Sequence, residues 1–72
     1  MKHIGKIINF NGTSGEIIDI AGITYILSKN NIIYPNPQNG DIVIFKVEEF
    51  NTVEVNERIA IFVSKIEEKN TK

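Results

Sequence analysis

The 72-residue chain is long enough for one domain, and its small size limits the core that it can bury. Apolar residues make up 42% of it and charged residues 24%, which are ordinary values for a globular protein. It has no cysteine, which excludes a disulfide scaffold and a thiolate metal site. The net charge of −1 lacks the basic surplus of many nucleic-acid-binding proteins, although a local basic patch would suffice.

The first residues, MKHIGKII, lack the long apolar segment of a signal peptide, and no apolar run is long enough to cross a membrane. A small cysteine-free chain fits a reducing compartment. We therefore expect a cytoplasmic protein with no membrane partner.

β-branched residues dominate and no strong helical periodicity is present, which predicts an all-β chain. The five expected strands span residues 3–10, 15–20, 23–28, 41–48 and 57–66. Residues 29–40 contain both prolines and predict a loop, with a single helical turn at Ile32, Ile33 and Tyr34. The polar stretch EEFNTVEVNE separates the last two strands, and the charged tail 67–72 is expected to fray.

Five short strands in so short a chain favour a closed barrel, which hides the strand edges and encloses one apolar face. Alternation within the fourth strand predicts a core face of Val43, Phe45 and Val47 and an outer face of Ile42, Ile44 and Lys46. We expect one domain over residues 1–66, a small five-stranded antiparallel barrel of the OB type. A small SH3-like barrel, which differs in strand order, is the alternative fold.

Several motifs run through the chain at spacings found in one family of such barrels. The residues concerned are Gly5, Ile7, Asn9, Phe10, Asn11, Gly15, the run Gly40-Asp41-Ile42-Val43-Ile44-Phe45, Ala60 and Val63. Over residues 4–66 they resemble the cold-shock domain, whose first strand has Trp at the place of Asn9 and whose fourth opens Gly-Asp-x-Val-x-Phe. The resemblance implies an OB-type barrel that binds single-stranded nucleic acid.

The departures from that family fall in its two RNA-binding motifs. The first motif reads Lys-Gly-Phe-Gly-Phe-Ile in the family and SGEIID, residues 14–19, in this chain, so both rings and the Lys are missing. The second reads Phe-x-His-Phe in the family and YILS, residues 25–28, here. Because single strands bind by stacking bases on rings, the resemblance implies weak binding of RNA or single-stranded DNA with low sequence specificity.

The residues expected to bind nucleic acid are Phe10, Tyr25, Tyr34, Lys6, Lys29 and Asn11. Tyr25 is expected to be exposed because it alternates with Thr24 and Ile26, which we expect to face inward. Phe10 either stacks on a base or closes the core, and Tyr34 either binds or caps its loop. Phe50 and Phe62 are interpreted as core residues or loop anchors.

A second hypothesis is a protein-interaction module on the same barrel, with nucleic-acid binding lost. Ile18, Leu27, Ile42 and Ile44 would then form an exposed apolar patch. Glu16 supports this hypothesis if it lies on the binding face, because it would repel phosphate there. It is otherwise an ordinary exposed charge on a strand.

Catalysis and cofactor binding find no support in the sequence. His3 has no second His or Cys to complete a metal site, and no serine is convincingly placed beside it as a nucleophile. Gly12 and Gly15 are not followed by the Lys-Ser/Thr of a phosphate-binding loop. We expect no enzyme activity, no cofactor and no metal.

Overall fold

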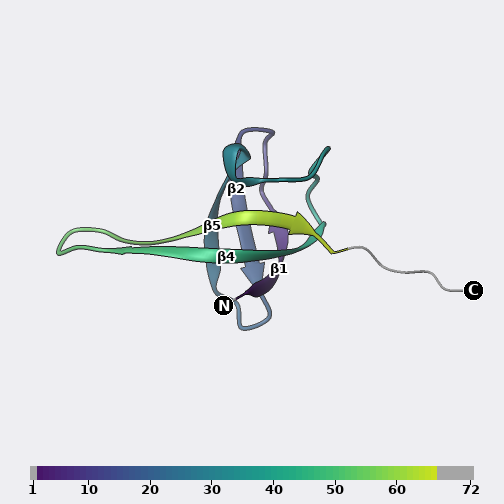
Figure 1. Ribbon diagram of the computed structural model, residues 1–72. Coiled ribbons are helices and arrows are strands. Elements are labelled where there is room, and N and C mark those ends of the chain that lie inside the picture. Colours follow the sequence, from purple (N-terminus) through teal and green to yellow (C-terminus); the bar gives the residue numbers. More distant parts are fainter. Residues whose placement is uncertain (1, 67–72) are drawn as a thin grey trace, which may run out of the picture.

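The computed structural model describes residues 2–66, and they form an all-β fold of five strands closed into a barrel (Figure 1). The strands are β1 His3–Ile8, β2 Ser14–Asp19, β3 Thr24–Ser28, β4 Ile42–Asn51 and β5 Asn56–Lys65. Their order around the barrel is β1-β2-β3-β5-β4, and β1 pairs with β4 to close it. The expected OB-type barrel is therefore confirmed, while the charged tail lies outside the described residues.

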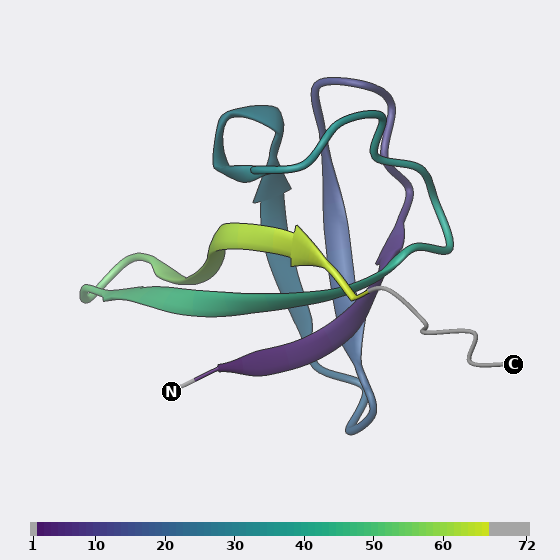
Figure 2. The ribbon, with the colours of Figure 1, turned by 45° about the vertical axis from the view of Figure 1, so that its right-hand side comes forward.

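The pairing is antiparallel except at one place. β3 and β5 run parallel and meet through Ile26 and Ile59, so this pair departs from the antiparallel pairing of the expected barrel. β5 links β3 to β4, and the pairing of β4 with β1 then closes the barrel (Figure 2).

Two glycines allow the strands of the barrel to approach one another closely. A Cβ on Gly5 would lie 2.6 Å from Ile17 Cγ2, and one on Gly15 would lie 2.7 Å from Phe10 Cα. Both distances are too short for a side chain, so glycine is required at both positions. The spacing of five residues between Phe10 and Gly15 thus has a direct packing reason.

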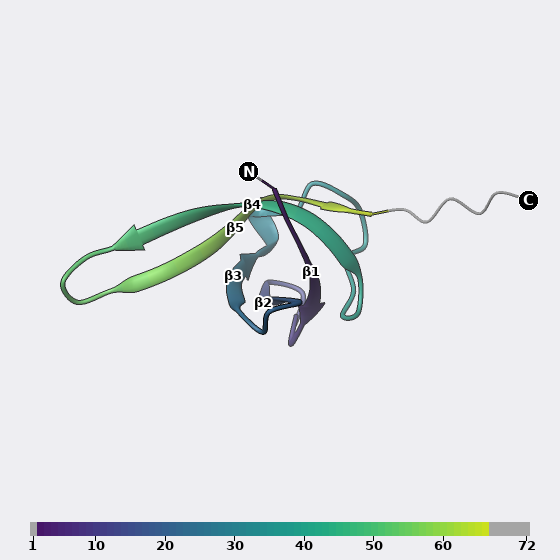
Figure 3. The ribbon, with the colours of Figure 1, turned by 90° about the horizontal axis from the view of Figure 1, so that it is seen from below.

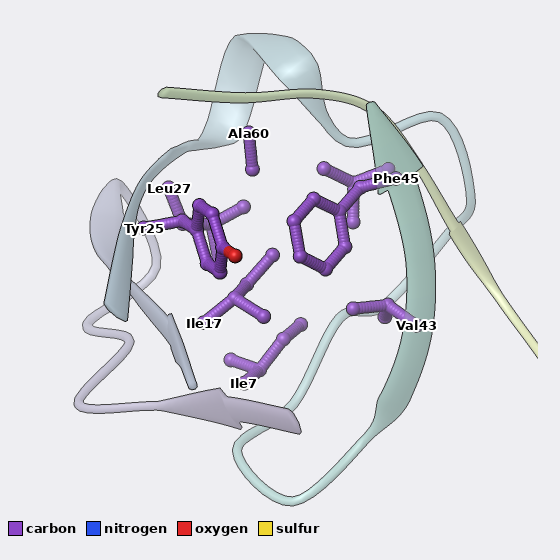
Figure 4. Close-up of a cluster of buried hydrophobic side chains, with 8 residues drawn as sticks. Ile7, Ile17, Tyr25, Leu27, Val43, Phe45 and Ala60 are labelled. Atoms are coloured by element: carbon purple, nitrogen blue, oxygen red, sulfur yellow. The ribbon is translucent and has the colours of Figure 1, made fainter. Parts of the chain in front are cut away.

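The core consists of side chains that alternate inward along all five strands (Figure 4). Its members are Ile7, Ile17, Tyr25, Leu27, Val43, Phe45, Ala60 and Val63. The Tyr25 and Phe45 rings meet edge to face with centroids 5.1 Å apart, and His3 lies within 5.8 Å of both. The expected inward face of β4 is confirmed for Val43 and Phe45, and Val47 is half-buried.

Tyr25 is in this core, so the expectation that it is exposed is wrong. Its side chain is only 5% exposed, and it pairs across the sheet with the buried Ile17, whereas Thr24 and Ile26 face outward. The phenol can be buried because its O–H donates to Asp19 Oδ2 at 2.7 Å. This bond is the main cause that lowers the pKa of Asp19, and hydrogen bonds from two backbone N–H groups add to it. The pKa of Tyr25 is raised mainly by burial and also by the same bond.

The single helical turn lies three residues earlier than expected. It is a 3-10 turn, η1, at Lys29–Asn31, and the Ser28 hydroxyl accepts from the Asn30 N–H at its start. Ile32 is extended and forms a parallel bridge with Val63 of β5. The bridge to Val63 requires Ile32 to be extended, so the helical turn ends before this residue and does not include it.

The polar stretch between the last two strands is a β-hairpin and not a loop. β4 and β5 stay paired from Glu48 and Ile59 out to Asn51 and Asn56, beyond the barrel wall (Figures 1 and 3). We call residues 48–58 the arm. Its turn is closed by Thr52, whose N–H donates to the Val55 carbonyl at 2.7 Å.

Charge separates between the barrel and the arm, which the net charge of the whole chain does not show. Among the described residues, the barrel carries five lysines against three acidic residues, whereas the arm carries four glutamates against Arg58. Phe50 in the arm is 46% exposed and Phe62 of β5 is 60% exposed, so the interpretation of these two rings as core residues or anchors is wrong.

Candidate nucleic-acid interface

The outer surface of β1, β2 and β3 is where the resemblance would locate the binding residues. Its side chains are Ile4, Lys6, Ile8, Ser14, Glu16, Ile18, Thr24 and Ile26, and we call it the sheet face. It carries no ring, and its one lysine is offset by Glu16, which is exposed and accepts from Asn9 Nδ2 at 3.3 Å. Aromatic stacking is therefore unavailable on this surface.

The proposed apolar patch of the second hypothesis is not formed as expected. Leu27 is completely buried, and Ile18 and Ile44 are half-buried, which leaves Ile42 as the exposed member at 42%. Ile42 and Ile44 also lie on β4, outside the sheet face.

Three of the expected binding residues meet instead at one end of the barrel. Phe10, Tyr34 and Lys29 line a groove of about 360 Å³, together with Gly12, Ile32, Pro35, Asn36 and Pro37. We call it the loop-end groove. It lies where the loop between β1 and β2 faces η1 and the segment that leads to β4, at the top of Figures 1 and 2. Phe10 and Tyr34 are half-buried and Lys29 is exposed, so rings and a cation share one recess.

Hydrogen bonds between the side-chain amide of Asn39 and the backbone of Phe10 hold Phe10 at this groove. The Phe10 N–H donates to Asn39 Oδ1 at 2.7 Å, and Asn39 Nδ2 donates back to the Phe10 carbonyl at 3.1 Å. The Lys29 N–H donates to the Thr13 carbonyl at 2.8 Å, which ties η1 to the same loop. The sequence placed Asn39 only within the expected loop 29–40, and nothing in a linear sequence shows that it reaches Phe10.

Tyr34 is held by a carboxylate at the start of β4. Its O–H donates to Asp41 Oδ2 at 2.8 Å, the Gln38 N–H donates to the same oxygen at 2.9 Å, and Lys65 Nζ lies 3.7 Å from Oδ1. Burial and then the bond to Asp41 raise the pKa of Tyr34. Burial also pulls the pKa of Asp41 upward, but the two hydrogen bonds and Lys65 outweigh it and leave that pKa below its usual value.

The other three expected residues lie elsewhere or serve the fold. Asn11 uses its Oδ1 to accept from the N–H groups of Thr13 and Ser14, both at 2.9 Å, so it shapes the turn beside Phe10. Lys6 projects from the sheet face into a separate shallow hollow, and Tyr25 is in the core.

A second ring with lysines around it was missed in the sequence. Phe62 lines a hollow of about 290 Å³ with Lys2, Ile33, Ile44, Phe45, Lys46 and Ser64. Lys46 Nζ lies 5.8 Å from the centroid of the Phe62 ring, within cation–π range. Strict alternation from the buried Ala60 places Phe62 inside the barrel, and only an irregularity in the pairing of β4 and β5 turns it outward.

Within residues 2–66 no three His, Cys, Asp or Glu side chains gather as a metal site, and no helix there is long and apolar enough to cross a membrane. A scan against protein-family models gives no match, and a search of curated proteins gives none. The likeness to the cold-shock domain therefore stays a prediction that rests on the motifs and on the barrel.

Proposed function

We propose that the chain binds single-stranded RNA or DNA, weakly and with low sequence specificity, and that it does so at the loop-end groove. The supporting observation is that Phe10, Tyr34 and Lys29 line one recess although they lie on three separate segments of the chain. Rings stack on bases whatever their identity, and an ammonium group attracts the phosphates between them. Two half-buried rings offer little stacking area, which accounts for weak affinity.

The barrel's charge supports the same proposal. Lys29 is exposed at the groove, and among residues 2–66 no acidic side chain lines it. The carboxylate of Asp41, which holds Tyr34, also accepts from the Gln38 N–H and lies beside Lys65. A phosphate that approached the groove would therefore meet a cation without a competing carboxylate in the lining.

A titration of labelled oligopyrimidine at two salt concentrations tests the proposal. Non-specific binding has dissociation constants of about 10⁻⁴ to 10⁻⁶ M, so binding is expected at low salt with about 100 µM protein. Phe10→Ala should weaken it by about 5-fold or more, and Lys29→Ala should reduce the salt dependence by roughly one phosphate contact. Lys6→Ala removes the same charge from the sheet face and is the matched control. Absence of binding by the unmodified chain at low salt would refute the proposal.

A second candidate function, docking to a protein with a basic surface, is favoured by the arm. Phe50 and Val55 are more than 40% exposed and Val53 is fully exposed, among Glu48, Glu49, Glu54 and Glu57. Exposed apolar side chains of this kind mark interaction surfaces. Four glutamates would repel a nucleic acid, so a cationic protein surface is the complementary partner.

This candidate is tested with a variant in which an Asn-Gly turn replaces residues 49–58, so that the paired residues Glu48 and Ile59 flank the turn. The unmodified chain should bind a partner identified by affinity capture when both are purified, and the affinity should fall as salt increases. The shortened variant should lose that binding and keep the barrel. Equal binding by both proteins would show that the arm is not the docking element.

A further inference from the structure

We propose that Phe62 is a second stacking platform, flanked by Lys2 and Lys46, for a base of the same single strand that occupies the loop-end groove. The inference rests on the proposed function and adds a site on β5, a strand to which neither the motifs nor the resemblance assign a binding residue.

The backbone at Phe62 is the first observation. Ile44 pairs with Ser64 while Lys46 pairs with Ile61, so β5 has one more residue than β4 between these pairs and bulges there. Phe62 has a φ of +53°, in the left-handed region. Glycine adopts that conformation without strain, whereas a bulky side chain rarely does. Bulges also redirect side chains and are frequent beside functional sites.

Burial of the ring does not compensate for this strain. The Phe62 side chain is 60% exposed, although the next residue, Val63, is completely buried. A glycine at position 62 would permit the same bulge and leave Val63 in the core. The need to fold therefore accounts for the bulge but not for an aromatic ring on it, and strained positions of this kind concentrate at binding sites.

The hollow around the ring has the chemistry of a nucleotide site. Lys2 and Lys46 supply two ammonium groups, Ser64 supplies a hydroxyl, and no acidic side chain from the described part of the chain lines the hollow. Lys46 Nζ lies 5.8 Å from the ring centroid, so a base stacked on Phe62 would place its phosphate near a cation. A ring with cations beside it is the arrangement by which single strands are bound without sequence preference.

A single short segment separates this hollow from the loop-end groove. Ile32 lines the groove and Ile33 lines the hollow, as expected for neighbouring residues of an extended segment. The segment is fixed to the bulge, because Ile32 bridges Val63 and the Ile33 N–H donates to the Val63 carbonyl at 2.9 Å. A single-stranded nucleic acid that crosses this segment would reach both the loop-end groove and Phe62. A shorter one would reach only the loop-end groove.

Oligonucleotides of two lengths test the inference, about 4 and about 12 nucleotides, which span much of the range of site sizes of OB barrels. The unmodified chain should bind the longer one more tightly. Phe62→Ala should weaken binding of the longer one by about 5- to 100-fold and change binding of the shorter one by less than about 2-fold. Phe50→Ala removes another exposed ring, on the acidic arm, and should leave both affinities unchanged.

Phe62→Gly separates loss of the ring from damage to the fold. Both Phe62 variants lack the ring, but glycine relieves the left-handed backbone and alanine does not, so the glycine variant should unfold at a temperature higher by about 4 °C or more. Both should bind the longer oligonucleotide equally weakly. If the unmodified chain binds and Phe62→Ala binds the longer oligonucleotide as tightly, the second platform is refuted while the proposed function stands. If the unmodified chain binds neither length, the proposed function itself fails.

Discussion

The sheet face and the loop-end groove are two surfaces of the same small barrel with opposite chemistry. The sheet face presents aliphatic and small polar side chains with one lysine and one glutamate, whereas the groove gathers two rings and a lysine. The resemblance to the cold-shock domain implies rings on the first surface. The difference shows that a barrel of this geometry does not need rings on its sheet face, and that its exposed rings can lie at the loop end of the barrel instead.

The barrel's own packing explains the contrast. Its strands supply two rings to the core, Tyr25 and Phe45, which pack against each other and against His3. A chain of this size has little other volume with which to fill an interior. Of the rings outside the core, Phe10, Tyr34 and Phe62 lie at strand ends, loops or a bulge, where alternation no longer determines which way a side chain points. Phe50 lies in the arm, beyond the barrel wall.

The largest effect is expected at the contact that positions the groove. Gly15→Ala would place a Cβ 2.7 Å from Phe10 Cα, and because both are backbone positions the clash forces β2 and the loop apart. We expect a loss of about 1–3 kcal/mol in the free energy of unfolding, measured by urea denaturation. Thr13→Ala, an exposed change in the same loop, should stay within about 0.5 kcal/mol. Equal stability of both variants would contradict the close packing described above.

The sheet face offers a test by gain of binding. Glu16 and Ile26 pair directly across β2 and β3 and both are exposed, so Glu16→Lys with Ile26→Phe adds a cation and a ring without touching the core. One stacked base is worth about 1–3 kcal/mol, and we therefore expect oligonucleotide affinity to rise by about 10-fold. Glu49→Lys makes the same charge change on the arm as a control. If that control raises affinity equally, net charge and not the sheet face is responsible.

Acid should lower the stability of the fold, because Asp19 and Asp41 accept hydrogen bonds from Tyr25 and Tyr34. Their pKa values are lower in the folded chain than the usual value of about 3.9, so their stabilising contribution is complete above that value and disappears as pH falls through the lowered pKa values. Stability should therefore fall below about pH 4. Asp41→Asn should be less stable at pH 7 and lose less on acidification, measured by thermal unfolding from pH 7 to pH 2. Glu57→Gln, on the arm, should retain the full pH dependence.

The smallest effect is expected from removing the arm. The hairpin is exposed along residues 48–58, and an isolated two-stranded hairpin is at best marginally stable in water. Replacing residues 49–58 with an Asn-Gly turn should change the free energy of unfolding by less than about 1 kcal/mol. Oligonucleotide affinity should stay level or rise slightly, because glutamates are removed. A large loss of either quantity would show that the arm supports the barrel or the groove.

The sequence by itself determined where the strands lie, because strand formation depends on local chemistry. β-branched residues and turn residues located all five strands to within a few residues, and the alternation in β4 identified Val43 and Phe45 as core. The Phe10 to Gly15 spacing was noticed through the resemblance to the cold-shock domain, and the structure supplies its reason, a close backbone contact that requires glycine.

Only the tertiary structure decided which way the aromatic rings point. Alternation shows that Tyr25 lies on the opposite face of β3 from Thr24 and Ile26, but it does not show which face is buried. The cross-strand pairing with Ile17 and the hydrogen bond to Asp19 place Tyr25 on the buried face. At Phe62 the bulge in β5 breaks the alternation altogether. The groove forms because Asn39 hydrogen-bonds to Phe10 across 29 positions of sequence, a contact that exists only once the barrel has closed.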